Sequence, residues 1–361
     1  MISLTNAHLQ VDPAILLHPG GFLWWYFDLV DENGQGLVLI WSYGLPFLPG
    51  VAAASRRGEP RPPIERPSLN VTFYRDGRPD FYLLQEYEPE DTAWDGLSWK
   101  MGGNTMRAHL DDDNQLTVEV SLDAPVPGMG HRLTGTLQVQ GALRQGGADG
   151  EADPDHEWAP LTVAARGEAN LTVGDRSWQL TGRAYHDRNL GRKPLHELGI
   201  DRWWWGRLAF PEGEMIFYYL LPEEPGAAPR CVSLTILRDG TVRWVEDAEI
   251  QITGRRWSPY GLWWPSALTV SDPDGREVSV AFDALVDDGP FYHRYLISGR
   301  RGDDTASGTA ELVVPGRVDL GWMRPLVRMR VHHTAAANSF WLPLFSGPRQ
   351  GRVERLLGRR A

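Results

Sequence analysis

The chain has 361 residues, which is long enough for two domains of ordinary size, and its 42% hydrophobic and 23% charged residues are typical of a globular protein. The formal net charge of −11 predicts no basic face, so the charge balance argues against a nucleic-acid partner. The single cysteine, Cys231, excludes an internal disulfide framework, and the chain lacks the run of about 18 apolar residues that predicts a transmembrane span.

Short β-type runs, separated by turns rich in Gly, Pro, Asn and Asp, follow one another along most of the chain. Asp76-Gly77 and Asp239-Gly240 lie between alternating or apolar segments, which is a strong local signal for a β-hairpin. Helical periodicity is confined to RVERLLGRR, residues 352–360. The sequence therefore predicts an all-β fold.

Three stretches of the first half of the chain match stretches of the second half in the same order. The matched pairs are 24–43 with 203–222, 72–85 with 235–247, and 118–124 with 278–284. The repeat predicts two copies of one β-domain, residues 1–199 and 200–361, each a closed or nearly closed antiparallel barrel that can hold one ligand. The Pro- and Arg-rich stretch 44–67 occurs in the first copy alone, so we expect it to serve function, as a lid would.

Tryptophan is unusually frequent, with 16 residues in the chain. Its large ring, and an N–H that needs a partner when buried, suit either an aromatic core or the wall of a cavity for a large apolar ligand. The aromatic clusters of the first matched pair are the candidates for such a wall. The candidate substrate-binding residues are Trp24, Trp25, Tyr26, Trp41, Trp203, Trp204 and Trp205.

The stretch AYHDRNLGRKPL, residues 184–195, gathers ionisable side chains at what reads as the end of a strand. Side chains alternate between the two faces of a strand, so Tyr185 and Asp187 share one face and His186 points to the other. A second pair, His156 and Trp158, has the same spacing at the start of another predicted strand. If both pairs face one cavity, they supply it with a carboxyl group, an imidazole, a phenol and an indole.

This set of groups suits the protonation of an isolated alkene. A carboxyl group kept neutral by apolar burial can supply the proton, and aromatic faces stabilise the carbocation that results. A neutral imidazole can then accept a proton from attacking water. The spacing also permits a purely structural role, in which Asp187 caps the turn at DRNLG and His156 merely opens a strand.

Other chemistries find little support in the sequence. His332 and His333 are adjacent and would point to opposite faces of a strand, and no H-x-x-x-H or C-x-x-C spacing occurs, so we expect no metal site. Ser42 lies outside any G-x-S-x-G motif, and the glycine-rich motifs of nucleotide sites are missing. We therefore expect no cofactor.

Several motifs together resemble those of the carotenoid 1,2-hydratases, also called hydroxyneurosporene synthases. They are WWYFD (24–28), HEW (156–158), YHDRN (185–189), DDGPFYHRYLISG (287–299) and GWMRPLVRMRV (321–331). The likeness covers most of the chain and implies a tandem of two lipocalin-like barrels, in agreement with the repeat. The wider superfamily includes Diels–Alderase-type pericyclases and cyclases acting on terpenoid or polyketide chains.

The resemblance also implies roles for individual residues. In those hydratases a His-x-Trp pair and a Tyr-x-Asp pair are functional, and both patterns are present here. Asp187 would be the general acid, Trp158 and Tyr185 would stabilise the cation, and His156 would orient or deprotonate water. Leu190 stands where the family commonly has Trp, a departure that bears on substrate identity.

Three functions remain open at this point. The first is a cofactor-free hydratase that adds water to a terminal C=C bond of an acyclic isoprenoid or carotenoid. The second is a cyclase or Diels–Alderase-type pericyclase acting on a terpenoid or polyketide polyene. The third is a lipocalin-like carrier that binds a lipophile unchanged, although a carrier has no need for an acid beside its ligand.

The two ends of the chain bear on localisation. The first residues lack a basic start followed by an apolar core, so no secretory signal is predicted and we expect a cytoplasmic protein. The tail at 348–361 carries five arginines and one glutamate. It is either a solvated terminus or a segment that lies on anionic lipid at the inner face of the cell membrane.

Overall fold

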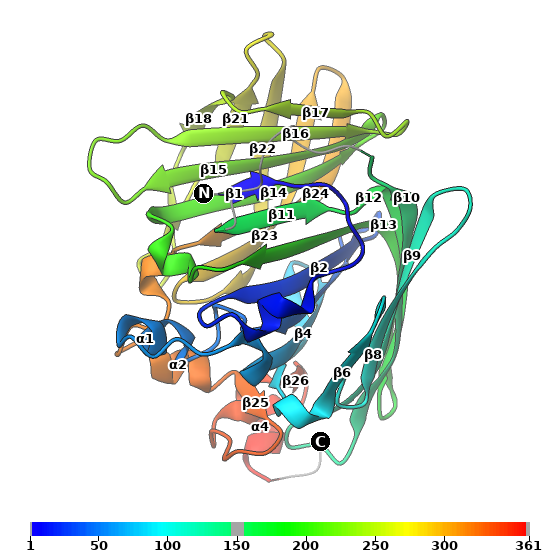
Figure 1. Cartoon of the computed structure of the whole chain (residues 1–361), viewed down its shortest axis with the longest axis vertical. Coiled ribbons are helices and arrows are strands. Elements are labelled where there is room, and N and C mark those ends of the chain that lie inside the picture. Colours follow the sequence, from blue (N-terminus) through cyan, green and yellow to red (C-terminus); the bar gives the residue numbers. More distant parts are fainter. Residues whose placement is uncertain (1, 146–154, 359–361) are drawn as a thin grey trace.

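The computed structural model describes residues 2–145 and 155–358, and these fold into two large, curved, mainly antiparallel sheets (Figure 1). The prediction of an all-β, lipocalin-like fold is confirmed. Figure 1 shows the second sheet above the first, with short helices along the left side and at the lower end of the molecule. Neither hydrogen-bonded order closes on itself within the described residues, so each sheet is an open, curled half-barrel.

The first sheet is built mainly from the N-terminal half of the chain. Its main order is β25-β5-β4-β3-β2-β13-β12-β10-β9-β8-β7-β6, and β1, β11 and β26 pair beside this path. The strands are β1 (Ile2–Leu4), β2 (Phe22–Val30), β3 (Gly36–Tyr43), β4 (Pro67–Arg75), β5 (Arg78–Glu86), β6 (Thr92–Asp95), β7 (Ser98–Met101), β8 (Asn104–Leu110), β9 (Gln115–Pro125), β10 (Arg132–Leu143), β11 (His156–Pro160), β12 (Thr162–Val173), β13 (Arg176–Gly191), β25 (Val331–His333) and β26 (Gly347–Pro348).

The second sheet has the order β17-β16-β15-β14-β24-β23-β22-β21-β18. Its strands are β14 (Ile200–Phe210), β15 (Gly213–Pro222), β16 (Arg230–Leu237), β17 (Val242–Val245), β18 (Glu249–Thr253), β21 (Ala267–Ser271), β22 (Glu277–Asp288), β23 (Tyr292–Arg301) and β24 (Asp304–Val313). A separate small ribbon pairs β19 (Arg256–Trp257) with β20 (Trp263–Trp264).

Helices are few and short in the described part of the chain. The α-helices are α1 (Val51–Arg56), α2 (Arg324–Arg328), α3 (Leu342–Phe345) and α4 (Arg352–Leu356). The 3₁₀ turns are η1 (Pro13–Leu17), η2 (Pro63–Glu65), η3 (Pro89–Asp91), η4 (Leu195–Glu197) and η5 (Pro315–Arg317). None of the described helices is long and apolar enough to cross a membrane.

The repeat is visible in the strand order. The run β5-β4-β3-β2-β13-β12-β10-β9 in the first sheet corresponds to β17-β16-β15-β14-β24-β23-β22-β21 in the second. Two of the three sequence matches align equivalent strands, β2–β3 with β14–β15 and β4–β5 with β16–β17. The third match is wrong, because it aligns β9 with β22, which lie one strand apart in the two orders. Alternating apolar residues recur in every half-buried strand. A match this short therefore does not identify equivalent strands.

The end of the chain returns to the first sheet. β25 pairs in parallel with β5, with Val331 opposite Leu84, and β26 pairs antiparallel with the same strand, with Gly347 opposite Tyr82. These pairings cover the edge of β5, which would otherwise present unpaired backbone groups. The expected unit of residues 200–361 therefore needs correction, because the second sheet ends at Val313 and the following segment packs against the first.

Helix α4 falls within the one stretch that the sequence predicted to be helical. Arg355 in this helix is 6% exposed and donates hydrogen bonds of 2.7 to 3.1 Å to three backbone carbonyl oxygens of residues 346–350. Arg352 donates to the carbonyl oxygen of Gly347 at 3.0 Å. These two arginines of the tail thus bind the protein itself, and contact of the tail with lipid stays a prediction.

Strand β2 buries both of its faces, so its sequence FLWWYFDLV is almost continuously apolar. Leu23, Trp25 and Phe27 point into the core enclosed by the first sheet. Trp24 and Tyr26 point the other way, into a core that contains residues of both sheets. This second core, rather than a barrel interior, holds the candidate site.

Strand β14 repeats this arrangement in the second sheet. Trp203 and Trp205 face the core between the sheets, whereas Trp204 and Leu208 face the core enclosed by the second sheet. The aromatic runs 24–26 and 203–205 of the repeat therefore meet where the two sheets pack together. The first and third rings of each run face this interface.

A buried ion cluster also joins the two sheets. Arg207 of β14 donates from Nε to Oδ2 of Asp28 on β2 at 3.2 Å and from Nη2 to Oδ1 of the same carboxylate. Glu214 accepts from Arg207 Nη1 at 3.3 Å, and the Thr309 hydroxyl donates to Asp28 Oδ2 at 3.1 Å. The guanidinium and both carboxyl groups are at most 4% exposed, so the cluster lies out of reach of solvent.

Candidate functional site

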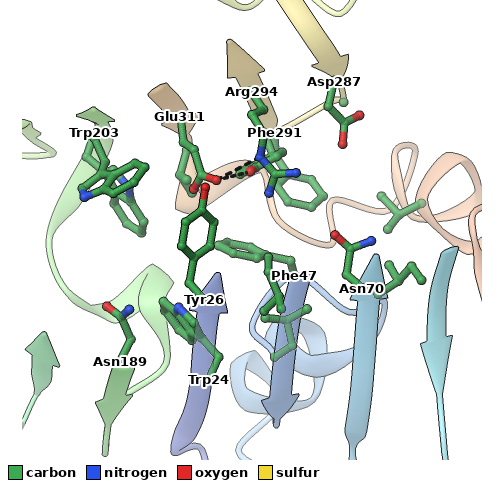
Figure 2. A pocket seen from close by; sticks show the side chains of 18 of the residues that line it. Trp24, Tyr26, Phe47, Asn70, Asn189, Trp203, Asp287, Phe291, Arg294 and Glu311 are labelled. Carbon is green, nitrogen blue, oxygen red and sulfur yellow. Dashed lines mark hydrogen bonds and ion pairs between the residues drawn. The ribbon is translucent and has the colours of Figure 1, made fainter. Parts of the chain in front are cut away.

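A cavity of about 120 Å³ lies between the two sheets, and most of its wall is apolar. The aromatic rings that line it are Trp24, Tyr26, Phe47, Tyr82, Trp203, Trp205, Tyr218, Phe291 and Tyr292. Figure 2 shows several of these rings and a smaller group of polar side chains directed into the same space. Such a site, mostly apolar with a few convergent polar groups, is typical of binding and catalytic cavities for small molecules.

Four of the seven candidate substrate-binding residues line this cavity, namely Trp24, Tyr26, Trp203 and Trp205. The other three do not, because Trp25 and Trp41 belong to the core of the first sheet and Trp204 to the core of the second. Successive side chains of a strand point to opposite faces, so a run of adjacent aromatic residues cannot line one cavity. The assignment of Trp25, Trp41 and Trp204 to the wall is therefore corrected.

The two polar pairs of the sequence converge on the carboxyl group of Asp187. Strand β11 pairs antiparallel with β13, which places Trp158 opposite Asn189. Trp158 Nε1 and the Tyr185 hydroxyl both donate to Asp187 Oδ2 at 2.8 Å. Asn189 Nδ2 donates to Asp187 Oδ1 at 2.9 Å, and Asn189 Oδ1 lies 2.9 Å from His156 Nε2. One hydrogen-bonded chain thus runs from the indole and the phenol to the imidazole.

Asp187 is 3% exposed, and burial raises the pKa of its carboxyl group to about 7. The hydrogen bonds from Trp158 and Tyr185 favour the carboxylate and oppose this rise, whereas the negative charges of Glu311 and Asp28 add to it. Desolvation outweighs the hydrogen bonds, so a large fraction of Asp187 carries a proton near neutral pH. Asp187 and Asn189 both line the cavity.

His156 is buried, and burial lowers the pKa of its imidazole to about 4. Its ring makes edge contacts with Phe22 at 5.2 Å and Trp24 at 5.6 Å between ring centroids. Nδ1 has no hydrogen-bond partner among the residues that the structure describes. The imidazole is therefore neutral at physiological pH, and it contributes to the cavity wall beside Asn189.

Trp158 and Tyr185 contact Asp187 rather than the cavity, since neither residue forms part of its lining. The Trp158 ring packs edge-on against Tyr218 at 5.0 Å, and the Tyr185 ring lies 5.6 Å from Trp205. Their expected role as faces against a bound cation is thus not favoured by the geometry. Their N–H and O–H groups instead hold the carboxyl group in place.

His186 lies on the opposite face of β13, as the alternation predicts. Its ring stacks on Phe27 with a centroid distance of 4.0 Å, and Nδ1 lies 3.0 Å from the carbonyl oxygen of Tyr26. Burial lowers the pKa of His186 to about 3. The adjacent His186 and Asp187 therefore do not form a pair.

A second polar wall of the cavity was not predicted from the sequence. Glu311 Oε1 accepts from the Tyr292 hydroxyl at 2.6 Å and from Arg294 Nε at 3.0 Å, and Figure 2 shows the guanidinium and this carboxylate together. Arg330 donates to Asp287 Oδ1 at 2.8 Å. The motif at 287–299 contains three of these residues. It supported the family resemblance, but nothing in its spacing predicted that its side chains line the same cavity as Asp187.

The insertion at 44–67 closes one side of the cavity. Leu45 and Phe47 form part of the lining, and the Phe47 ring stacks on Phe291 at 5.8 Å. Helix α1, which follows, is attached to the segment after the second sheet, because the Ala53 N–H donates to Asp319 Oδ2 at 3.0 Å. This placement is the one that a lid would require.

Within residues 2–145 and 155–358, no group of three or more His, Cys, Asp or Glu side chains is arranged to hold a metal ion. His333 instead contacts Glu86, with Nδ1 2.9 Å from Oε2, at the point where β25 joins β5.

Comparisons with solved structures agree on the tandem lipocalin-like class of fold. A candidate AttH protein of Nitrosomonas europaea aligns with a TM-score of 0.59 at 14% identity, covering 82% of this chain and 93% of that one. Kievitone hydratase from Nectria haematococca aligns with a TM-score of 0.51 at 13% identity, covering 87% and 98%. At this level of identity the likeness concerns the fold alone.

The family model described as Carotenoid hydratase CrtC matches residues 43–339, and the chain belongs to this family. Hydroxyneurosporene dehydrogenase of Chlorobaculum tepidum is 27% identical over 372 residues, covering 94% of this chain and 95% of that protein. Acyclic carotenoid 1,2-hydratase of Thiocapsa roseopersicina is 27% identical over 320 residues, covering 82% and 70%. The resemblance seen in the motifs is thereby confirmed.

Proposed function

We propose that the protein is a hydratase that adds water to a terminal C=C bond of an acyclic carotenoid or a related isoprenoid, with Asp187 as the general acid. Membership of the carotenoid hydratase family supports the class of reaction and the lipophilic substrate. The observation that carries the proposal is the buried carboxyl group of Asp187, which has a raised pKa and lines an aromatic cavity.

The first step transfers the proton of Asp187 to the alkene. Oδ2 already accepts two hydrogen bonds, from Trp158 and Tyr185, whereas Oδ1 accepts one, from Asn189. Oδ1 is therefore the oxygen with room for the transferable proton. The π electron pair forms the new C–H bond, the O–H bond breaks, and a tertiary carbocation faces the newly formed carboxylate.

The lining rings then stabilise the cation. Trp24, Tyr26 and Trp205 are buried members of the wall around Asp187, and the negative faces of such rings attract cations most strongly where water is excluded. The carboxylate of Asp187 adds a full opposite charge. Both contributions act on the charge that develops in the transition state, which is where stabilisation raises the rate.

Water completes the reaction with His156 as the base. The water oxygen forms the C–O bond, one of its O–H bonds breaks, and the neutral imidazole takes the proton. Return of one proton from His156 to Asp187 restores the starting state. The balance consumes only water, in keeping with a cofactor-free addition.

The substitution Asp187→Asn tests this proposal, because it removes the acid and retains the shape of the side chain. We expect turnover of an acyclic carotenoid such as lycopene to fall by about a thousandfold. Product formed in H₂¹⁸O and analysed by mass spectrometry should carry the heavy oxygen. Asp123→Asn, which changes a half-exposed carboxyl group paired with Arg132, is the matched control and should leave turnover unchanged.

Full activity of the Asp187→Asn protein would contradict the proposed acid. An isomeric product without the heavy oxygen would instead indicate the cyclase, for which the family match offers no support. A tightly bound and unchanged ligand would indicate a carrier.

A further inference from the structure

We propose that Asn189 is a positioning residue that orients His156 and Asp187 for opposite proton transfers. This inference rests on the proposed function, since it assigns a part in the same reaction to a residue that touches both proposed acid and base. Asn189 is 3% exposed, lies on β13 two residues after Asp187, and bridges the two groups through its amide.

The hydrogen-bond directions follow from the chemistry of the amide. Asn189 Nδ2 can only donate, and it donates to Asp187 Oδ1 at 2.9 Å. Asn189 Oδ1 can only accept, and the atom facing it at 2.9 Å is His156 Nε2. Nε2 therefore carries the ring proton, and the basic lone pair of the neutral imidazole resides on Nδ1.

This tautomer is the one that the proposed reaction needs. Nδ1 makes no hydrogen bond to any described residue, so it is the ring nitrogen left to accept a proton from water. With the opposite tautomer, the lone pair would point at the amide of Asn189 and could not act on a cavity ligand. The bridge thus fixes a base that would otherwise exchange between two forms.

The amide dipole also matches the charges that arise during turnover. Once Asp187 has given its proton to the alkene and His156 has taken one from water, the site holds a carboxylate and an imidazolium. The N–H₂ end of Asn189 then faces the negative group and its carbonyl oxygen faces the positive one. Both hydrogen bonds strengthen in this state, because bonds to ionised partners are stronger than those between neutral groups.

Other charged and titratable groups surround the carboxyl group, and the side chain of Asn189 makes its hydrogen bonds to His156 and Asp187 rather than to them. They are Glu311 on β24, Asp28 on β2, Tyr218 on β15 and Tyr185 on β13. A change in the pH dependence on removal of Asn189 alone can therefore be attributed to its own hydrogen bond.

The substitution Asn189→Ala removes both ends of the bridge. Loss of the bond to the carboxylate should move the alkaline limb of the pH–rate profile upward by about one pH unit, because a bond that favours the ionised form is gone. Loss of the hold on His156 should lower kcat by about tenfold. A lower kcat together with activity that extends to higher pH is a combination that mere loosening of the fold does not produce.

Asn189→Asp separates the two functions of the bridge. The new carboxylate can still accept from His156 Nε2, but it cannot donate to Asp187 and it places a like charge beside it. We expect a larger upward shift of the alkaline limb, with the Nε2-protonated tautomer retained. Nitrogen-15 NMR of histidine-labelled protein, assigned by comparison with His156→Gln, identifies the tautomer independently of activity. This measurement still tests the inference if the alanine variant folds poorly.

Asn70→Ala is the matched control. Asn70 is a buried amide on the far side of the cavity in Figure 2, and its Nδ2 donates to the carbonyl oxygen of Leu83. Its loss should leave the alkaline limb and the His156 tautomer where they are. Protonation of His156 at Nδ1 in the wild type, or an unmoved limb in both Asn189 variants, overturns the inference while leaving the proposed function intact; activity of Asp187→Asn overturns the proposed function itself.

Discussion

Asp187 retains a proton near neutral pH because the surroundings that favour its neutral acid outweigh those that favour its carboxylate. Three donors, on Trp158, Tyr185 and Asn189, favour the carboxylate, yet full burial and two nearby carboxyl groups favour the neutral acid. The same donors that oppose protonation also lower the energy of the carboxylate left after the proton has been transferred. A buried acid with ready-made donors is therefore suited to giving its proton away.

The pH dependence of kcat/KM follows from these groups. Asp187 must be protonated, so activity should fall about tenfold per pH unit above its pKa of about 7. His156 must be neutral, so activity should also fall below its pKa of about 4. A carotenoid carries no ionisable group, so both limbs report the enzyme, and rates measured from acidic to mildly alkaline buffers should give a plateau between them.

A second buried carboxyl group provides the control for this profile. Burial also raises the pKa of Glu214 to about 7, but Glu214 contacts Arg207 in the ion cluster and does not line the cavity. Glu214→Gln should therefore keep the alkaline limb. Activity that increases through pH 7 in the wild type would be incompatible with Asp187 as the acid.

Local sequence rules reached only part of the site. Strand alternation and the motifs placed Tyr185 and Asp187 on one face, because both rules act over neighbouring residues. Glu311 could not be found in this way, because it reaches the cavity from β24 of the other sheet. Trp25 and Trp204 were misplaced because strands buried on both faces show no polar side by which to orient them.

At the scale of elements, the insertion at 44–67 is attached to the segment that follows the second sheet. Asp319 accepts from the Ala53 N–H at 3.0 Å and pairs with Arg324, while Arg56 donates to the carbonyl oxygen of Val318 at 3.0 Å. Asp319 adopts a φ of 62°, a conformation that glycine tolerates better than other residues. Glycine can therefore replace Asp319 without adding backbone strain.

Asp319→Gly should loosen the insertion by removing the acceptor for α1. Arg56 and Arg57 offer trypsin cleavage sites, whereas Arg61 and Arg66 each precede a proline and are not cut. We expect cleavage after Arg56 and Arg57 to become about tenfold faster, since a hydrogen bond to a charged group is lost. KM should increase as well, because Phe47 belongs to the cavity wall. Limited proteolysis followed by mass spectrometry identifies the sites.

Asp111→Gly offers a comparison for this experiment, since Asp111 Oδ1 accepts from the Gln115 N–H at 2.8 Å in a turn between β8 and β9. It removes a similar bond away from the insertion and should leave the cleavage rate after Arg56 and Arg57 unchanged. Equal cleavage of the Asp319→Gly and wild-type proteins would show that this bond does not hold the insertion in place.

Some of the helices and strands could be predicted from the sequence, and others could not. The hairpins β4–β5 and β16–β17 follow from Asp-Gly turns, and α4 follows from its periodicity, because these signals are local. β25 and β26 are very short and are strands only because they pair with β5, a partner more than 200 residues away in the chain. No pattern within three residues can predict such a pairing.

At the scale of the whole molecule, the site exists only where the two sheets meet. Asp187, Tyr26 and Asn189 come from the first sheet, whereas Trp205 and Glu311 come from the second. The repeat predicted two similar units, but it contained no information on which faces pack together. The cavity is thus a property of the interface, and whatever fixes the two sheets against each other also fixes the reacting groups.

The ion cluster of Asp28, Arg207 and Glu214 is the contact to test for this role. Asp28→Asn leaves a buried guanidinium with a weaker partner and should lower the free energy of unfolding by about 3–5 kcal/mol, and Arg207→Met should cost a similar amount because it leaves buried carboxyl groups unpaired. The double variant should lose less stability than the two single variants together. Both charges of the Asp28–Arg207 pair are then removed, so neither is left without its partner. Urea unfolding followed by tryptophan fluorescence and by circular dichroism gives these energies, and coincident transitions would show that the sheets unfold together. Costs that simply add would mean that the pair does not couple the sheets, and the rigidity of the cavity would then have to come from the aromatic packing of β2 against β14.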